Sequence, residues 1–202
     1  MPQPVVQPGE HVSSPFRVRW TRADCEGLVA RGLLDHGRYE LIEGEIIRKT
    51  GQRPPHAAAV ARLFAWCLSI FGGDLVLSQA TIDVAPEDNL TSEPEPDVFV
   101  LNQSVAAFTD GYPGPSDLVL VAEVADTTLA FDLSTKAALY ARAGIGEYWV
   151  VDVAGRSLTT HRDPRAGVYQ SVVRYAADES VSPAGRPESP VLVATLLPPL
   201  AL

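Results

Sequence analysis

Apolar residues recur at helical spacing through the stretch from residue 54 to residue 71. The stripe consists of Ala59, Leu63, Trp66 and Ile70, which stand at i, i+4, i+7 and i+11. This spacing places the four side chains on one face of a helix. Pro54-Pro55 suits the first turn of such a helix, and Gly72-Gly73 suits its end. The pattern therefore predicts a long helix with one buried face.

Short segments of strand character lie on both sides of this helix. Before it, residues 39–47 read as two short strands joined by a Glu-Gly turn. After it come three strand-like segments, at residues 75–84, 97–101 and 118–124. The segment 118–124 is nearly continuous in apolar residues, which is typical of a central strand that is buried on both faces.

A second helix and a further strand complete a crossover unit. The helix begins at about Thr128 or Asp132 and ends at Arg142, and a strand follows at residues 147–152. The strands before and after this helix are expected to be parallel, with a right-handed connection. The short strands joined consecutively before the unit favour an antiparallel meander. Together they predict an α/β fold, a three-layer α/β/α sandwich with a mixed central sheet.

The two ends of the chain are less regular. Residues 1–15 contain four prolines and little periodicity, so we expect a flexible leader there. Residues 156–161 and 168–175 predict an exposed, polar antiparallel pair, and the apolar run at 191–197 predicts an edge element. With 202 residues the chain is long enough for one domain, which we assign to residues 16–202.

Composition indicates a soluble globular protein of the cytoplasm. The chain is 46% hydrophobic and 20% charged, and no apolar run reaches the length of a membrane span. The N-terminus lacks the features of a secretory signal. Cys25 and Cys67 are isolated thiols without metal-ligand spacing, so we expect both to be free.

The formal net charge of −9 disfavours tight, general binding of nucleic acid, because such binding depends on cationic contacts. A nucleic-acid substrate therefore requires a local basic face, or a metal site that uses part of the negative charge. The only local basic run consists of Arg48, Lys49 and Arg53. This run either follows a phosphate backbone or forms a solvated loop.

Two carboxylates are expected to meet at one edge of the sheet. If strands 97–101 and 118–124 are antiparallel neighbours, Asp97 at the start of one lies beside Glu123 near the end of the other. Mg²⁺ is commonly held by one or two carboxylates together with water and substrate phosphate. Asp97 after a proline is also consistent with a simple turn residue, whereas Glu123 inside an apolar strand needs a partner.

Lys136 is one of only two lysines, against fourteen arginines. Leu133, Ala137 and Tyr140 share one face of the second helix, and Lys136 lies on that face, toward the sheet. A buried ammonium is costly unless a carboxylate pairs with it, so we expect Lys136 to meet Glu123. Asp97, Glu123 and Lys136 are then together, as metal-dependent phosphodiester cleavage requires. A purely structural bridge between Lys136 and Glu123 is the alternative.

Several of these segments resemble the putative restriction endonuclease family of bacteria, in the PD-(D/E)xK nuclease superfamily. The most distinctive is the string from Lys136 through Tyr140-Ala-Arg-Ala-Gly144 to Asp152. The others are Glu95-Pro96-Asp97, Val121-Ala122-Glu123-Val124, Tyr39-Glu-Leu-Ile-Glu43-Gly-Glu45-Ile, His56 and the terminal Leu196-Leu-Pro-Pro-Leu200. The resemblance covers about residues 20–175 and implies a restriction endonuclease-like fold.

The resemblance also implies an endonuclease that depends on Mg²⁺ or Mn²⁺ and acts on DNA. Asp97 and Glu123 would be the metal ligands, Lys136 would orient or deprotonate the attacking water, and Glu43 would be a further acidic member of the site. The superfamily's usual lysine, two residues after the glutamate, is Ala125 here, so Lys136 would take over its role. The family's Ser-Pro-Ser-Thr-like turn is replaced by residues 125–128, in which Asp126 either adds a carboxylate or turns the chain.

The roles of Glu43 and His56, the oligomeric state and the activity each have more than one interpretation from the sequence. Glu43 at a hairpin turn is equally consistent with a site residue and with a solvated turn. His56 either reaches the site or is a boundary histidine. A homodimer is plausible, because one small sheet edge rarely engages both strands of a duplex. A catalytically inactive nuclease-fold protein, acting as a binding or regulatory module, is the alternative function, and the acidic surface and altered lysine position favour it.

Overall fold

A six-stranded mixed sheet forms the centre of the computed structural model, which describes residues 18–49 and 53–199. Its strands follow one another in the order β3-β4-β5-β6-β7-β8. They are β3 (Val76–Leu77), β4 (Val98–Leu101), β5 (Leu118–Ala125), β6 (Glu147–Asp152), β7 (Ser157–Arg165) and β8 (Val168–Ala176). All neighbours are antiparallel except β5 and β6, which are parallel. The predicted meander and crossover pair are confirmed, whereas the predicted leader at 1–15 lies outside the described residues.

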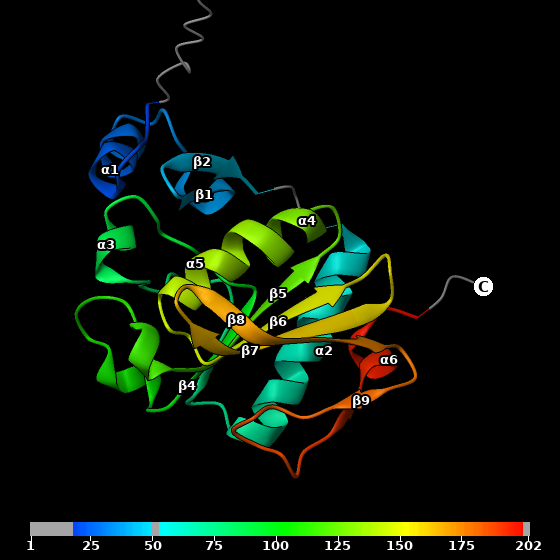
Figure 1. Cartoon of the computed structure of the whole chain (residues 1–202). Helices are drawn as coiled ribbons and strands as arrows, with labels where there is room; N and C mark the ends of the chain where they lie inside the picture. The colour runs from blue at the N-terminus through cyan, green and yellow to red at the C-terminus, as the bar shows by residue number, and fades with distance from the viewer. Residues whose placement is uncertain (1–17, 50–52, 200–202) are drawn as a thin grey trace, which may run out of the picture.

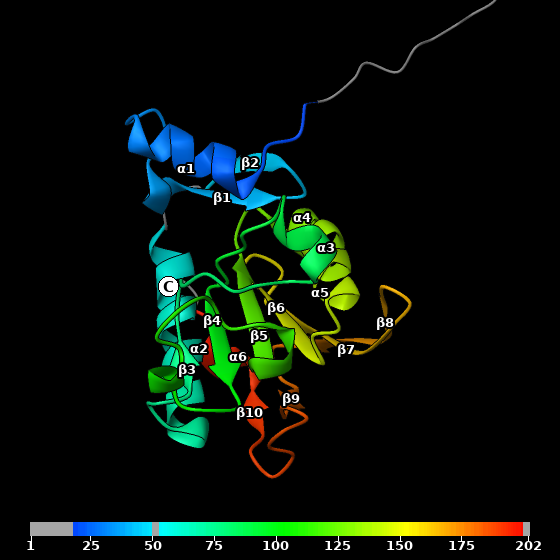
Figure 2. The same cartoon turned by 90° about the vertical axis from the view of Figure 1, so that its left-hand side faces the viewer.

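Helices cover both faces of the sheet, so the three-layer arrangement is confirmed (Figure 1; Figure 2). One face carries α2 (Pro54–Phe71) and α6 (Val193–Leu196), whose apolar side chains share a core with β4 and β5. The other face carries α4 (Leu129–Phe131), η4 (Asp132–Lys136) and α5 (Ala137–Arg142). The alternation of side chains along the strands supplies apolar residues to both cores.

Helix α2 buries nearly the face that the periodicity predicts. Its buried residues are Ala59, Val60, Leu63 and Cys67. Trp66 and Ile70 are only partly buried, and the indole of Trp66 stacks on that of Trp149 in β6, with 5.7 Å between ring centroids. This packing fixes the start of α2 beside the ends of β4 and β5.

The strand predicted at residues 75–84 is wrong for most of its length, since only Val76–Leu77 belongs to the sheet. The rest runs beside residues 94–96 as irregular chain, with Gln79 N–H donating to Pro96 O and Ile82 N–H donating to Pro94 O. Proline has no N–H group to return these bonds, so a regular ladder cannot continue.

The C-terminal predictions also need correction. Only β8 of the predicted exposed pair is largely exposed, while the first five residues of β7 are buried. The run at 191–197 is no edge of the central sheet: β10 (Val191–Leu192) pairs with β9 (Ser180–Val181), and α6 then packs into the core. Burial of Val193 and Leu196 by α2 and the sheet explains this placement.

An N-terminal unit lies across one end of the sheet (Figure 1). It consists of α1 (Arg22–Ala30), η1 (His36–Arg38), β1 (Tyr39–Ile42) and β2 (Glu45–Arg48). The predicted hairpin is confirmed, with Glu43 and Gly44 at φ 50° and 78° in its turn, as a tight hairpin requires. Short elements in the connections are α3 (Pro86–Asn89), η2 (Val105–Ala107) and η3 (Pro115–Asp117). No helix in the described part of the chain is long and apolar enough to cross a bilayer.

His161 in β7 provides a test of this packing. It is buried between Tyr148 and Tyr169, with ring centroids 5.2 and 5.6 Å away, and its Nδ1 has no partner among the described residues. Burial lowers the pKa of His161, so the unfolded chain takes up a proton before the native protein does as the pH falls. The neutral imidazole of His161 therefore stabilises the native protein above the ordinary histidine pKa, and this stabilisation is lost as the pH falls below that value.

We expect His161→Phe to flatten the fall in the free energy of unfolding between pH 7 and pH 5. Urea denaturation of both proteins across this range measures the difference, which for one proton is at most about 1.4 kcal/mol per pH unit. Equal slopes would show that the imidazole is not held neutral by its surroundings.

Candidate active site

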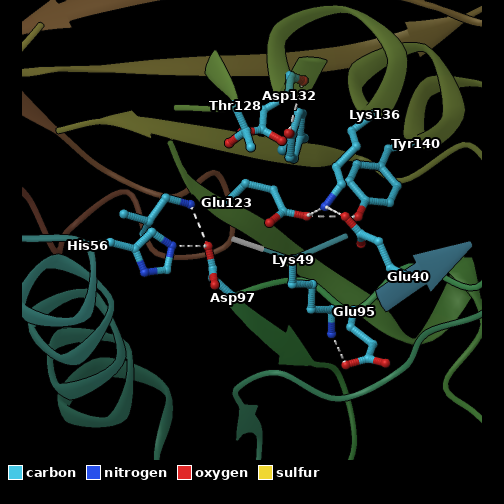
Figure 3. Close-up of polar contacts among 12 residues, drawn as sticks. Glu40, Lys49, His56, Glu95, Asp97, Glu123, Thr128, Asp132, Lys136 and Tyr140 are labelled. Carbon is cyan, nitrogen blue, oxygen red and sulfur yellow. Dashed lines mark hydrogen bonds and ion pairs between the residues drawn. The ribbon is translucent and has the colours of Figure 1, made fainter. Parts of the chain in front are cut away.

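An open pocket of about 880 Å³ lies where the N-terminal unit meets the ends of β4 and β5. The start of α2 and the segment from Asp126 to Lys136 complete its walls. Figure 3 shows its polar side chains converging from these elements. The carboxylates in its lining are Glu40, Glu95, Asp97, Glu123, Asp126 and Asp132. The cationic side chains are Arg38, Arg48, Lys49, Arg53 and Lys136.

The predicted meeting of Asp97 and Glu123 is confirmed. Val98 pairs with Ala122 in antiparallel register, so Asp97, the residue just before β4, lies across from Glu123. Residues directly opposite in such a pair project from the same face. Asp97 Oδ2 accepts a hydrogen bond from the backbone N–H of Val124 at 2.9 Å, which ties the carboxylate to β5. Both side chains face the same pocket (Figure 3).

Lys136 reaches Glu123 from the layer formed by α4, η4 and α5, as its position on the helix predicts. Its Nζ lies 2.8 Å from Glu123 Oε1 and 3.0 Å from Glu40 Oε1. The hydroxyl of Tyr140 donates to the same Glu123 oxygen at 3.1 Å. The side chains of Lys136, Glu123 and Glu40 are 5%, 6% and 8% exposed, so the ion pairs are almost fully removed from water.

The helix that carries Lys136 is not a regular α-helix at this point. Residues Asp132–Lys136 form one π-helical turn between α4 and α5. Both Asp132 and Lys136 are buried and line the pocket, and the hydroxyl of Thr128 donates to Asp132 Oδ2 at 2.5 Å. π-Turns are rare and frequently occur at functional sites. Here the turn brings Asp132, which the sequence-based prediction did not include in the site, to the pocket.

The buried charges do not balance. Burial raises the pKa of Glu123 well above its usual value, and Asp97, Asp132 and Glu40 raise it further, against the opposing effect of Lys136. Burial also raises the pKa of Asp132. Burial alone would lower the pKa of Lys136, but the surrounding carboxylates outweigh it and raise that pKa. One ammonium therefore faces a surplus of negative charge.

Glu43, predicted as a further acidic member, does not reach the cluster. Its Oε1 lies 2.7 Å from Arg142 Nη2 on the surface, and it does not line the pocket. The structure therefore corrects the prediction: Glu43 stays in the hairpin turn, paired with Arg142, and does not join the pocket. Glu40, three residues earlier, is the carboxylate that the hairpin contributes. The sequence contained a signal that could have identified Glu40 as a site residue, because Glu40, like Glu123, is a charged residue inside a mostly apolar strand.

His56 lies at the pocket rather than on a remote boundary. Its Nε2 is 3.3 Å from Asp97 Oδ2, and this contact with Asp97 raises the pKa of His56. The sequence indicated a histidine near a helix start. It did not indicate the contact, which depends on how α2 packs against β4 and β5.

The basic run also lines the pocket, but two of its members are paired with acids. Lys49 forms an ion pair with Glu95, and Arg53 Nε lies 2.7 Å from Asp126 Oδ2. Asp126 is thus engaged by an arginine at the mouth of the pocket. The run therefore lies at the pocket, while Arg48 and Arg53 are also exposed, so contact with a phosphate backbone stays a prediction.

The donor set suits a hard divalent cation. In the described part of the chain no three histidine, cysteine, aspartate or glutamate side chains group closely enough to enclose a metal ion by themselves. Mg²⁺ needs no such enclosure, since it keeps several waters and uses one or two carboxylates together with substrate phosphate. Asp97 and Glu123 provide such a pair. Nearby, Glu40 Oε2 is buried without a partner among the described residues, which adds to the local demand for positive charge.

Fold and site together define the class: a restriction endonuclease-like protein, with two carboxylates at adjacent strand ends and a lysine beside them. Residues 33–190 match the Uma2 family, whose description is "Putative restriction endonuclease". The chain belongs to this family, as the sequence resemblance implies. The family description supports a nuclease in general terms.

A solved structure shows the same fold. The crystal structure of a "putative nuclease belonging to DUF820" from Anabaena variabilis matches with a TM-score of 0.61. The match covers 83% of this chain and 94% of that chain, at 15% sequence identity. A comparison with curated protein sequences gives no significant match.

Replacing Lys136 by methionine tests the buried network. We expect Lys136→Met to lower the free energy of unfolding by about 3–5 kcal/mol, because Glu123 and Glu40 would remain buried without their cation. Lys49→Met is the matched control: this ion pair with Glu95 is more exposed, and its loss should cost about 1 kcal/mol or less. Urea denaturation at neutral pH measures both, and equal losses would contradict the assigned network.

Proposed function

We propose that this protein is a metal-dependent endonuclease that hydrolyses phosphodiester bonds in DNA. The observation that carries the proposal is the convergence of Asp97, Glu123 and Lys136 on one pocket of a restriction endonuclease-like fold. Family membership supports the nuclease class, and the chemistry of the donor set supports the dependence on a metal.

Asp97 and Glu123 would hold the cation, Mg²⁺ or Mn²⁺. When bound, such an ion lowers the pKa of a water molecule and stabilises charge on a phosphoryl group. The chain's own part is to hold the two carboxylates at fixed positions on adjacent strands. The backbone N–H of Val124 and the side chain of His56 hold Asp97, while Lys136 and Tyr140 hold Glu123.

Lys136 would act as a fixed positive charge rather than as a base. Its raised pKa keeps the ammonium protonated at neutral pH, so it cannot accept a proton from water. An ammonium has three N–H groups, and Glu123 and Glu40 engage two of them. The third would orient a water molecule or a phosphate oxygen in the pocket. Of the two roles expected for this lysine, orientation is therefore the better supported.

The pocket offers a polyanionic substrate a more favourable surface than the net charge of −9 suggests. Five cationic side chains in its lining stand against six carboxylates, and a bound divalent cation would make the balance positive. Arg48, Lys49 and Arg53 line the pocket, where they would contact the backbone phosphates. Because one pocket reaches one strand, we infer that a homodimer would cut both strands of a duplex.

A catalytically inactive binding or regulatory module is the second candidate function. The specific observation in its favour is that Lys136 is locked between two carboxylates, while Ala125 occupies the superfamily's usual lysine position. Such a protein would bind nucleic acid or metal without cleavage. Activity measurements separate the two candidates.

Titration with Mn²⁺ by calorimetry tests the metal site without a choice of substrate. We expect the native protein to bind the ion, and Asp97→Asn and Glu123→Gln to lose detectable binding, because each removes one of the two anionic ligands. Glu43→Gln is the matched control and should bind as the native protein does. Equal binding by all four proteins would place the metal elsewhere.

Cleavage of labelled DNA and RNA strands, single and duplex, tests the reaction itself. We expect Mg²⁺- or Mn²⁺-dependent endonucleolytic products from DNA, reduced to background by chelator, by Asp97→Asn and by Lys136→Met, with Glu43→Gln fully active. Native protein that binds the metal and the strands but never cleaves them would support the inactive module.

Salt dependence of DNA binding tests the basic run of Arg48, Lys49 and Arg53. We expect Arg48→Gln and Arg53→Gln each to weaken binding and to reduce the slope of log affinity against log salt by about 1. Arg62→Gln is the control, since Arg62 on α2 contacts Thr195 O outside the pocket lining. If both pocket variants keep the native slope of log affinity against log salt, Arg48 and Arg53 do not contact phosphates.

A further inference from the structure

His56, at the start of α2, contacts one oxygen of Asp97. Its Nε2 lies 3.3 Å from Asp97 Oδ2, and the two side chains are 16% and 14% exposed. Figure 3 shows the imidazole between α2 and Asp97, on the side of that carboxylate away from Lys136. His56 is thus separate from the ion pairs of Lys136 with Glu123 and Glu40, and it contacts Asp97 instead.

The position of His56 is rigid for reasons visible in the chain. Pro54 and Pro55 occupy the first positions of α2, where their fixed φ suits a helix start, and His56 follows at once. Ala59 and Leu63, one and two turns later, are fully buried against the sheet. The helix therefore cannot slide relative to β4 and β5 without opening the core, and the imidazole is held with it.

Two groups from different elements consequently contact Asp97 Oδ2. One is the backbone N–H of Val124 in β5 at 2.9 Å, and the other is His56 Nε2. Donation from Nε2 needs only the neutral tautomer, so the contact does not depend on the charge of the imidazole. A carboxylate fixed through one oxygen presents the other in a defined direction.

We propose that His56 is a positioning residue for metal binding: by donating from Nε2 to Asp97 Oδ2, it orients Asp97 to bind a divalent cation. This inference rests on the proposed function, since it assigns the metal to Asp97 and Glu123. Groups that hydrogen-bond to a metal ligand orient that ligand, and their loss typically weakens metal binding about 10–100-fold. His56 itself would not touch the cation.

Two substitutions distinguish positioning from a general structural role. His56→Leu keeps the bulk and removes the donor. His56→Gln keeps a donor, because the glutamine amide nitrogen can occupy the position of Nε2. Calorimetric titration with Mn²⁺ on the full chain gives the affinities of both variants and the native protein. Thermal unfolding in chelator shows whether either variant alters the metal-free fold.

We expect His56→Leu to weaken Mn²⁺ binding about 10–100-fold and His56→Gln to stay within about threefold of the native protein, with similar unfolding temperatures in chelator. Native affinity in His56→Leu would overturn the inference. Equal weakening in both variants would also overturn it, since a hydrogen-bond donor alone would then not suffice.

Mn²⁺ binding by the native protein and by Asp97→Asn distinguishes a failure of this inference from a failure of the proposed function. If the native protein binds Mn²⁺, Asp97→Asn does not, and His56→Leu binds normally, the metal site stands and only the role of His56 falls. If the native protein binds no Mn²⁺, the proposed metal dependence and this inference fall together. Should His56→Leu unfold in chelator, His56→Gln decides: restored fold and affinity support positioning, and restored fold with weak affinity refutes it.

Discussion

The structure depends on one buried ammonium shared by two carboxylates that come from different parts of the chain. Lys136 on the π-helical turn contacts Glu123 in the central sheet and Glu40 in the N-terminal hairpin. Removing one partner from such a network leaves a buried charge that is costly to keep from water. The hairpin is therefore held where Glu40 meets Lys136, and the wall it provides turns a sheet edge into a pocket.

The same interaction shapes the chemistry. A lysine held by two carboxylates stays charged, which suits it to orient groups rather than to remove protons. Burial raises the pKa of Glu123, and the neighbouring carboxylates, which the single charge of Lys136 cannot balance, raise it further. A divalent cation would relieve this surplus of negative charge. The net negative charge of the chain opposes nucleic-acid binding at a distance. At the pocket, the metal ion that we propose would use part of this negative charge and would accept a phosphate oxygen as a ligand.

The lysine reaches the strand from a neighbouring element rather than from the strand itself. Ala125, two residues after Glu123, is buried, and the ammonium comes instead from η4 across the sheet face. The π-helical turn also carries Asp132 into the same space. On the opposite wall, the rigid start of α2 places His56 against Asp97. Side chains from five separate segments meet here, with the sheet as the common support.

The sequence by itself determined the layer architecture, most of the elements, and the meeting of Asp97, Glu123 and Lys136. It could do so because strand register and helical spacing are local regularities, and because an ionisable residue in an apolar segment must find a partner. Tertiary structure decided what depends on contacts between distant segments: Glu40 rather than Glu43 in the cluster, His56 beside Asp97, and the end of β3 opposite Pro94 and Pro96. A hairpin displays carboxylates on several sides, and only its docking onto the sheet selects the one that is buried.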